Sequence, residues 1–289
     1  MEILKRMIRK FEYYQALLNV YERRRRWIGE YDITDNALLS LLTNIEKIKD
    51  GLILDKTVKL FYQLKSDVGK QLFSYGTFEN GEISFFSQRL AAINQPVVLD
   101  IGANIGVHTV GWAKDNPQMR ICAFEPSPVT YKVLNKNIEL NKITGQVETF
   151  LLAVSNATET RSFYHAEDDA YSSLKDTKRK AVKDIFKIQT TTLDDFVKDK
   201  RLDKIDFIKI DVEGFEGEVI EGATQTLSKL RPDLFVEIYK GTDSNAAPEK
   251  TIKTLINMGY KAYIFIDGKL RPFSTHDDRY YNYYFTFTP

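Results

Sequence analysis

Short apolar runs alternate with helical repeats along most of the chain. In the clearest case, Val97, Val98 and Leu99 predict a short buried strand, and a helical pattern starts at Val107. Strands that alternate with helices are typical of a parallel, doubly wound α/β sheet. Further strands are predicted at 120–124, 147–154, 206–211, 234–238, 262–266 and 281–288, and further helices at 83–93, 126–140, 193–197, 217–230 and 251–258.

The N-terminal quarter has a different pattern. Apolar residues at spacings of three and four, from Leu4 to Tyr21, predict a helix over 3–28 with a heptad seam. Thr34 is suited to cap a second helix, and the mixed residues at 52–61 favour strands or a hairpin. We therefore expect a helical extension over 1–75 and a main domain over 76–289.

This extension allows two kinds of association. The seam between Leu4 and Tyr21 either packs on its own domain or pairs with a second copy, which would make the protein a homodimer. The basic run Arg23–Arg26, followed by Trp27, is either a solvated face or a peripheral contact with an anionic lipid surface.

Composition excludes several classes of protein. Of the 289 residues, 43% are hydrophobic and 28% are charged, as in ordinary soluble proteins, and the net charge is +1. This charge gives no reason to expect a nucleic-acid partner. No apolar run is long enough to span a bilayer, and the charged N-terminus does not resemble a secretory signal. Cys122 is the single cysteine, so we expect a reducing, cytoplasmic location.

The turn after the first buried strand points to a nucleotide. Gly102 and Gly106 bracket it, and glycine lets a ligand approach the backbone closely. The dinucleotide fingerprint needs a second glycine where Asn104 stands, and the phosphate-binding P-loop needs a following Gly-Lys-Ser/Thr. Asp100, just before the turn, would repel phosphates and favour a cation, such as the amino or sulfonium group of S-adenosylmethionine.

An acid ends the next predicted strand as well. Glu125 follows the run 120–124, and an acid at this place in a nucleotide-binding sheet is suited to hold ribose hydroxyls. The alternative is that the turn is only structural. With Glu125 in place, we favour the nucleotide.

Four segments together resemble the FkbM family of class I S-adenosylmethionine-dependent methyltransferases. Each motif is weak alone, but the set is specific, and the resemblance covers the chain from about Tyr75 to the C-terminus. It implies a Rossmann-like, mostly parallel sheet of seven strands whose last strand is antiparallel. The segments are Asp100–Gly106, Phe124–Pro128, Thr191–Phe196 and Lys209–Gly217.

The resemblance also implies roles for individual residues. It places Glu79 over the cofactor, Pro126 and Ser127 beside it, Ala153 near the adenine ring and Asp211 near the transferred methyl group. Alternatively, Glu79 is only a loop or cap carboxylate. It likens the segment 171–174 to an element near the substrate. We expect that segment to lie in a loop or lid over 167–183.

Carboxylates follow two neighbouring predicted strands. Asp211 ends the fourth strand, Glu213 lies in the turn after it, and Glu237 ends the fifth. They could act as general base, orient a sugar's hydroxyls or, less favoured, bind a divalent metal. Alternatively they form a network with Lys209, which shares a face with Asp211. His165 is another candidate base, and the scattered histidines show no zinc-site spacing.

These residues support one predicted activity and leave alternatives open. By resemblance, the chain transfers a methyl group from S-adenosylmethionine to an oxygen, most simply a sugar hydroxyl of a glycan or glycosylated metabolite. An N- or carboxyl-methyltransferase would use the same fold. A protein of a different class, a cofactor-binding scaffold subunit without activity, is the remaining alternative.

Overall fold

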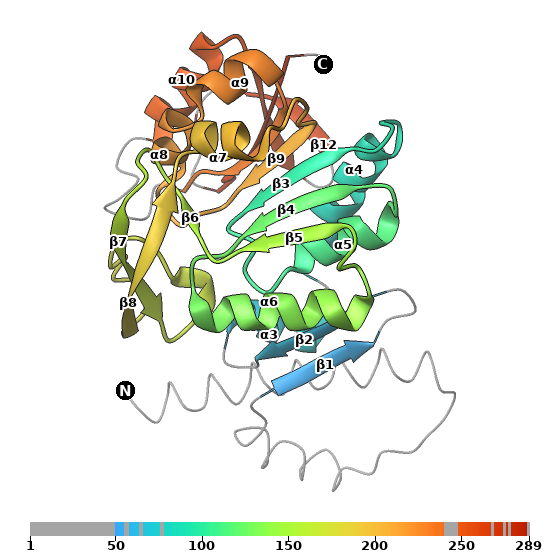
Figure 1. Cartoon of the computed structure of the whole chain (residues 1–289), viewed down its shortest axis with the longest axis vertical. Helices are drawn as coiled ribbons and strands as arrows, with labels where there is room; N and C mark the ends of the chain where they lie inside the picture. The colour runs from blue at the N-terminus through green and yellow to red at the C-terminus, as the bar shows by residue number, and fades with distance from the viewer. Residues whose placement is uncertain are drawn as a thin grey trace, which may run out of the picture. The chain divides into compact units, whose positions relative to one another are not determined.

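The computed structural model describes residues 50–54, 58–63, 66–75, 78–239, 248–266, 269–273, 276 and 279–287 (Figure 1). The chain divides into two compact units, Met1–Asn80 and Gly81–Pro289. The predicted helices before residue 50, their seam and the run Arg23–Arg26 lie outside the described residues. The homodimer, the lipid contact and the domain boundary at residue 75 therefore stay predictions.

The described part of the first unit is a hairpin and a helix. Strands β1 (Asp50–Leu54) and β2 (Lys59–Gln63) pair antiparallel, which confirms the predicted hairpin. Helix α3 (Asp67–Tyr75) was not predicted. The side chain of Ser66 caps it, accepting a hydrogen bond from the backbone of Gly69 at 3.0 Å.

Within the described ranges, the second unit is built on an eight-stranded sheet. The five strands from β10 to β5 run parallel, and β13 is antiparallel to both of its neighbours, as the resemblance implies. The eighth strand, β12, pairs antiparallel with β11 at the edge of the sheet, and the predicted sheet of seven strands did not include it. The order is β12 (Lys269–Pro272), β11 (Lys261–Ile266), β13 (Asn282–Thr286), β10 (Asp233–Glu237), β9 (Phe207–Ile210), β3 (Val97–Ile101), β4 (Arg120–Phe124) and β5 (Val147–Phe150).

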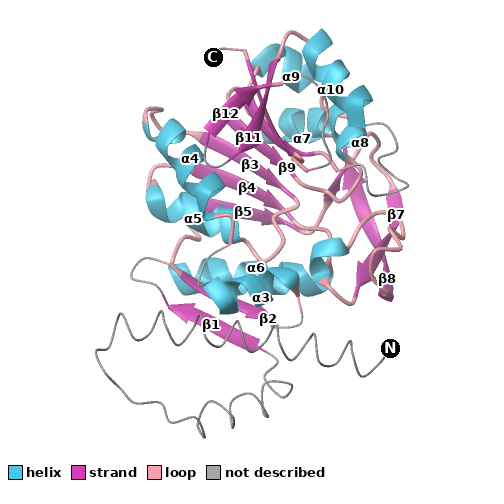
Figure 2. Cartoon of the chain, turned by 180° about the vertical axis from the view of Figure 1, so that it is seen from behind, coloured by secondary structure: helices cyan, strands magenta, loops and turns pink. Residues whose placement is uncertain are grey.

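Helices cover both faces of this sheet (Figure 2), which makes the fold the predicted doubly wound α/β class. On one face, α4 (Asn80–Ala91) brings Phe86 against Phe207 and Phe235, with ring centroids 4.6 Å apart in each pair. α5 (Val107–Asp115) packs on the same face, and α6 (Pro128–Asn141) packs beside α5. The opposite face carries α7 (Leu193–Lys200), α8 (Glu216–Glu221), α9 (Thr224–Leu230) and α10 (Pro248–Asn257).

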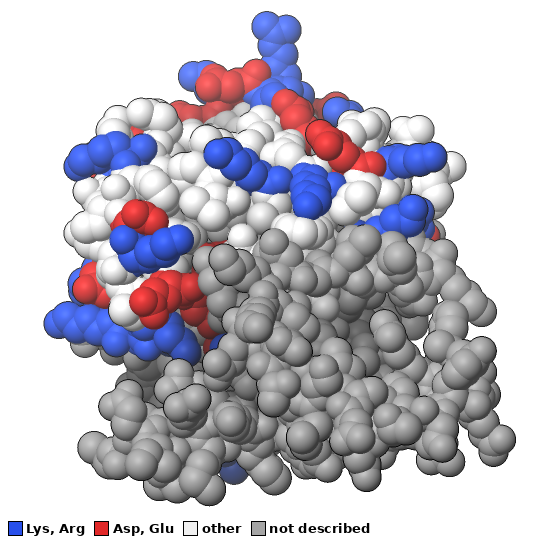
Figure 3. Space-filling view, turned by 90° about the horizontal axis from the view of Figure 1, so that it is seen from below, with Lys and Arg blue, Asp and Glu red and all other residues white. Residues whose placement is uncertain are grey.

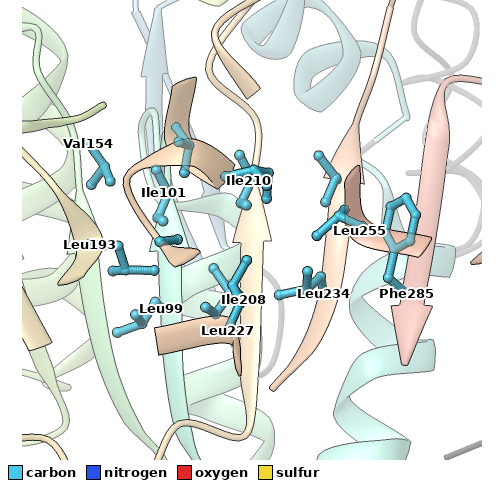
Figure 4. Close-up of a cluster of buried hydrophobic side chains, with 14 of the residues drawn as sticks. Leu99, Ile101, Val154, Leu193, Ile208, Ile210, Leu227, Leu234, Leu255 and Phe285 are labelled. Carbon is cyan, nitrogen blue, oxygen red and sulfur yellow. The ribbon is translucent and has the colours of Figure 1, made fainter. Parts of the chain in front are cut away.

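Alternate residues of the central strands form the core under the second set of helices. Leu99, Ile208 and Leu234 point to the same face and meet Leu227 and Leu255 from the helices (Figure 4). Because both faces of these strands are buried, their sequences read as apolar runs rather than as alternating patterns. This explains why the strands were readable from sequence.

The predicted strand 147–154 is two strands of different sheets. β5 stays in the main sheet, whereas β6 (Ala153–Val154) pairs with β8 (Val182–Thr191). β7 (Thr160–Ala166) completes that second sheet, which has three strands among the described residues. β7 pairs antiparallel with β8, and the start of β8 at residue 182 shortens the predicted loop 167–183 by two residues.

The predicted helix 217–230 is interrupted at Gly222. A Cβ atom at Gly222 would lie 2.1 Å from the carbonyl oxygen of Ser155, so the backbones touch here. A new helix, α9, then begins, and the Asp194 carboxylate accepts hydrogen bonds from the backbone N–H groups of Gln225 and Thr226 at 3.0 and 2.7 Å. The break therefore coincides with a long-range contact that periodicity does not report.

The described surface carries both signs of charge. On the face in Figure 3, basic and acidic side chains lie among uncharged ones, in keeping with the net charge of +1. No helix in the described ranges is both long and apolar enough to cross a bilayer.

Candidate active site

The glycine turn closes against two neighbouring strands. Gly102 and Gly106 have φ of +83° and +87°, which glycine adopts readily, and Asn104 between them has φ of +51°. A Cβ atom at Gly102 would lie 1.8 Å from the carbonyl oxygen of Asp211. The turn after β3 and the end of β9 therefore fit together only if residue 102 has no side chain.

Gly102→Ala is expected to destabilise the protein by more than the roughly 1–2 kcal/mol that an L-residue loses in the left-handed region, because the methyl group also collides with the Asp211 carbonyl. Thermal unfolding would measure this. Gly145→Ala is the matched control, since a Cβ atom there meets nothing within 4 Å. Equal unfolding temperatures for the two variants would contradict the close approach.

The backbone of the turn is already fully hydrogen-bonded. The N–H groups of residues 102 and 103 donate to the Phe124 carbonyl at 3.0 and 2.9 Å, and that of Gly106 donates to Ala103 at 2.9 Å. The N–H groups of Asn104 and Ile105 donate to the carboxylate of Glu125 and the side chain of Asn104, at 3.0 and 2.7 Å. Because these five donors are occupied, the turn does not offer the N–H cradle on which a pyrophosphate depends.

Glu125 joins the turn to the following helix. Its two oxygens accept hydrogen bonds from the backbone N–H groups of Asn104 and Ser127, at 3.0 and 2.8 Å. A carboxylate has about four lone-pair sites, so each oxygen retains the capacity to accept from a hydroxyl. Burial raises the pKa of Glu125 to about 8, although both backbone bonds lower it. Pro126 beside it is partly exposed, and Ser127 caps α6.

Asp100 lies inside the protein beside α5, and its contact with a cation of the cofactor stays a prediction. It is fully buried, and its Oδ2 accepts a hydrogen bond from the Thr109 hydroxyl of α5. Among the described residues, its Oδ1 has no hydrogen-bond partner. Burial raises the pKa of Asp100, while the nearby Lys209 ammonium lowers it. The pleat of β3 points this side chain toward Thr109 of α5.

Lys209 is a buried cation next to the end of β9. It is 4% exposed, and its Nζ lies 2.9 Å from the Oδ2 of Asp211, whose side chain is 27% exposed. Burial and the Lys209 charge together hold the pKa of His108 well below its ordinary value, as expected for a packed residue on α5. The buried Lys209 ammonium thus holds the carboxylate of Asp211, which stays partly exposed at the end of β9.

Asp211 and Glu237 end adjacent strands. Val236 is the register partner of Ile210 in the parallel pair β9–β10, so the next residue of each strand lies on the same face. Glu237 is partly exposed, like Asp211. The structure therefore brings these two predicted carboxylates to one edge of the sheet.

Glu213 points to a different partner. Its backbone has φ of +55°, and its Oε2 lies 2.5 Å from the Nη1 of Arg179. Burial and the neighbouring Asp211 raise the pKa of Glu213, whereas Arg179 lowers it. Within the described part of the chain, no group of three or more His, Cys, Asp or Glu side chains is arranged to hold a metal ion.

Glu216 is a site residue that the sequence did not single out. It is buried, and its Oε1 accepts a hydrogen bond from the backbone of Gly214 at 2.9 Å, which fixes the turn after Asp211. Burial raises its pKa to about 7. The repeat of glutamate and glycine at 213–217 was the available signal, but it did not distinguish the two acids.

Buried glutamates with raised pKa values make the stability of the ligand-free protein depend on pH. Glutamate ordinarily ionises near 4.5, so between 4.5 and about 8 folded Glu125 keeps a proton that the unfolded chain has lost, and Glu216 does so up to about 7. The free energy of unfolding therefore falls as the pH rises through this window, by roughly 1.4 kcal/mol per pKa unit and group. Thermal unfolding from pH 5 to 8 should show it, with a flatter slope in Glu216→Gln. A melting temperature that rises across this window would contradict the assignment.

His165 lies inside the protein rather than at an exposed site. Its exposure is 0%, and its Nδ1 lies 3.3 Å from the hydroxyl of Ser127 and 3.4 Å from that of Ser172. Its Nε2 lies 3.5 Å from the Oδ1 of Asp169. A buried imidazole in these contacts links the end of β4 to the segment 169–172. This geometry does not favour the predicted role of base.

Ala153 and Glu79 complete the set of predicted cofactor residues. Ala153 is buried in β6, and the following Ser155 bonds to Glu218 of α8 at 2.7 Å. Glu79 belongs to the first unit, and its cofactor contact stays a prediction.

Comparison with known proteins gives the family. The Methyltransferase FkbM domain matches residues 100–262. Methyltransferase sdnD of Sordaria araneosa is 26% identical over 175 residues, 51% of this chain and 68% of the relative. Hexuronic acid methyltransferase AglP of Haloferax volcanii is 29% identical over 147 residues, 51% of this chain and 57% of the relative. The 2-O-methyltransferase NoeI of Sinorhizobium fredii is 27% identical over 150 residues, 47% of this chain and 60% of the relative.

A solved structure, Methyltransferase FkbM from Methylobacillus flagellatus, aligns with a TM-score of 0.45 at 14% identity and covers 86% of this chain and 60% of that one. The family is shown by the domain match in the sequence over residues 100–262. That match spans more than half of the chain and contains the glycine turn, Glu125 and the Asp211 motif. The chain belongs to the FkbM family of methyltransferases.

Proposed function

We propose that this protein transfers a methyl group from S-adenosylmethionine to an oxygen of an acceptor, and that the acceptor is a sugar hydroxyl of a glycan or glycosylated metabolite. The observation that carries the cofactor assignment is the pairing of a hydrogen-bonded glycine turn with Glu125. Two relatives whose names refer to a hexuronic acid and to 2-O-methylation support an oxygen acceptor on a sugar.

The residues of the turn fit this cofactor better than a dinucleotide. The occupied N–H groups of 102–106 leave no cradle for a pyrophosphate, and S-adenosylmethionine has no phosphate. Its ribose needs acceptors, and Glu125 retains lone pairs for them.

The protein's own contribution to the reaction is orientation and control of a proton. When bound, the cofactor supplies an electrophilic methyl group. Asp211 and Glu237, at adjacent strand ends, are the groups that would accept the proton of an acceptor hydroxyl or hold that hydroxyl in line. Correct alignment of two reactants alone lowers the barrier by several kcal/mol, roughly 7–11 in the best cases.

Calorimetry and methyl-transfer assays test this function separately. S-adenosylhomocysteine should bind in the micromolar range and NAD should not. Labelled S-adenosylmethionine should then methylate an oligosaccharide from a panel that also holds amine and carboxylic acid acceptors. Tight NAD binding would contradict the cofactor assignment. Transfer only to amines or carboxylates would contradict a sugar hydroxyl as the acceptor. Cofactor binding without any methyl transfer would favour a scaffold protein.

A further inference from the structure

A basic segment lies next to the candidate active site. Residues 175–183 contain five cations against one acid, Asp176, although the whole chain has a net charge of only +1. Such a concentration on a short stretch of a nearly neutral protein is a feature that the proposed function has not yet used. The cations are Lys175, Lys178, Arg179, Lys180 and Lys183.

The chain docks this segment on the turn that follows Asp211. The hydroxyl of Ser173 donates to the carbonyl oxygen of Glu213 at 3.0 Å, and the Arg179 guanidinium pairs with the Glu213 carboxylate. The guanidinium carbon of Arg179 also lies 5.2 Å from the ring centroid of Tyr239, which follows β10 and Glu237. The basic segment therefore borders the ends of both strands that carry the candidate catalytic carboxylates.

Among the five cations, Arg179 forms an ion pair with a carboxylate, whereas the four lysines do not, as far as the structure describes the chain. Arg179 has Glu213, and the Lys180 ammonium lies 5.0 Å from the ring centroid of Tyr171. The four lysines are exposed, and in the ranges that the structure describes no carboxylate lies within ion-pair distance of any of them. A charge run on a surface loop is usually only solvated. This run differs because Arg179 within it and Ser173 just before it fix it beside the site.

We propose that residues 171–183 recognise a negatively charged acceptor, namely a glycan that bears carboxylate or phosphate groups. Complementary charge at the rim of a site speeds encounter with the ligand and selects against neutral competitors. Arg179, already paired with Glu213, positions the segment, and the lysines provide the field. This inference rests on the proposed function, because it names the acceptor class of the same site.

Binding to paired sugars tests the inference on the full-length protein saturated with S-adenosylhomocysteine. An oligosaccharide of glucuronic acid is compared by calorimetry with its carboxyl-reduced, neutral counterpart, and glucose 1-phosphate is compared with glucose. At least one charged member should bind roughly tenfold more tightly than its neutral partner, with an advantage that shrinks as salt is added. The two pairs distinguish carboxylate from phosphate. Equal binding of charged and neutral members in both pairs would overturn the proposal.

A triple variant tests whether these lysines are responsible. Lys175, Lys180 and Lys183 are changed to glutamine, and Lys178, whose backbone has φ of +57°, is left unchanged. Affinity for the charged sugar should fall roughly tenfold, while affinity for S-adenosylhomocysteine is unchanged.

The matched control changes Lys132, Lys229 and Lys253 to glutamine, which are exposed on other elements and remove the same charge. It should bind the charged sugar like the wild type. Equal losses in the two triple variants would overturn the proposal, because they would show an effect of net charge alone. Failure of the wild type to bind S-adenosylhomocysteine would instead contradict the proposed function, so the two failures are distinguishable.

Discussion

Replacing Glu125 with alanine is expected to weaken binding of S-adenosylhomocysteine by roughly 5- to 150-fold. With a pKa of about 8, the carboxyl group is mostly neutral at pH 7 in the ligand-free protein. Two neutral hydrogen bonds to the ribose hydroxyls contribute roughly 0.5–1.5 kcal/mol each, which gives that range. Loss of the bonds from Asn104 and Ser127 would loosen the turn and add to the effect.

Two further variants separate the ribose contact from support of the turn. Glu125→Gln keeps the shape but places an amide against one of the two N–H donors, so it should weaken binding less than alanine does. Glu148→Ala removes an exposed carboxylate from the neighbouring strand β5, together with its surface ion pair to Lys200, and should leave the cofactor affinity unchanged. Calorimetry and thermal unfolding are measured on all three. Unchanged affinity in a folded Glu125→Ala protein would remove Glu125 from the ribose site.

The central sheet could be predicted because its signals are local. Val97–Leu99, Ile121–Phe124 and Leu234–Val236 are apolar runs, and the acid that follows each run marks the edge where the site forms. Because the carboxyl ends of neighbouring parallel strands lie at one edge of the sheet, Asp211 and Glu237 were expected close together, and the register of β9 with β10 agrees with this.

Other features depend on contacts between distant parts of the chain. The break at Gly222 coincides with a close approach to the backbone of Ser155, and the pair between Arg179 and Glu213 spans 34 positions. Neither leaves a periodic trace in the sequence. Strand β8 reads as a polar, charged stretch because one sheet face is exposed, and its first residues fall in the predicted loop.

Side-chain direction is the second kind of information that the sequence withholds. The motif places Asp100 at the turn, but only the structure shows that the pleat of β3 directs its Oδ2 to Thr109. His165 was a candidate base because histidine suits that role, yet it is buried between Ser127 and Ser172. A motif gives the residue type and the element, whereas the chemistry depends on which face of the element the side chain occupies.

Asp211→Asn and Glu237→Gln are expected to lower the rate of methyl transfer by about 100- to 10,000-fold, the usual contribution of a general base. An acceptor hydroxyl must lose its proton as the carbon–oxygen bond forms, and these carboxylates end adjacent strands on one face. Cofactor affinity should change little, because the ribose contact lies at Glu125 on another strand. Turnover with labelled cofactor and calorimetry with S-adenosylhomocysteine measure the two quantities.

Three comparisons decide what the carboxylates do. Asp199→Asn removes an exposed acid on α7 and should keep full turnover. Asp211→Asn leaves the buried Lys209 ammonium without its carboxylate at 2.9 Å, so its unfolding temperature must be compared with that of the wild type before a loss is assigned to catalysis. Turnover that a chelator abolishes and magnesium, calcium or manganese restores would show a metal at these carboxylates instead of a base. Near-normal turnover in both folded variants would leave Asp211 and Glu237 as supports of the turn and give the proton to solvent.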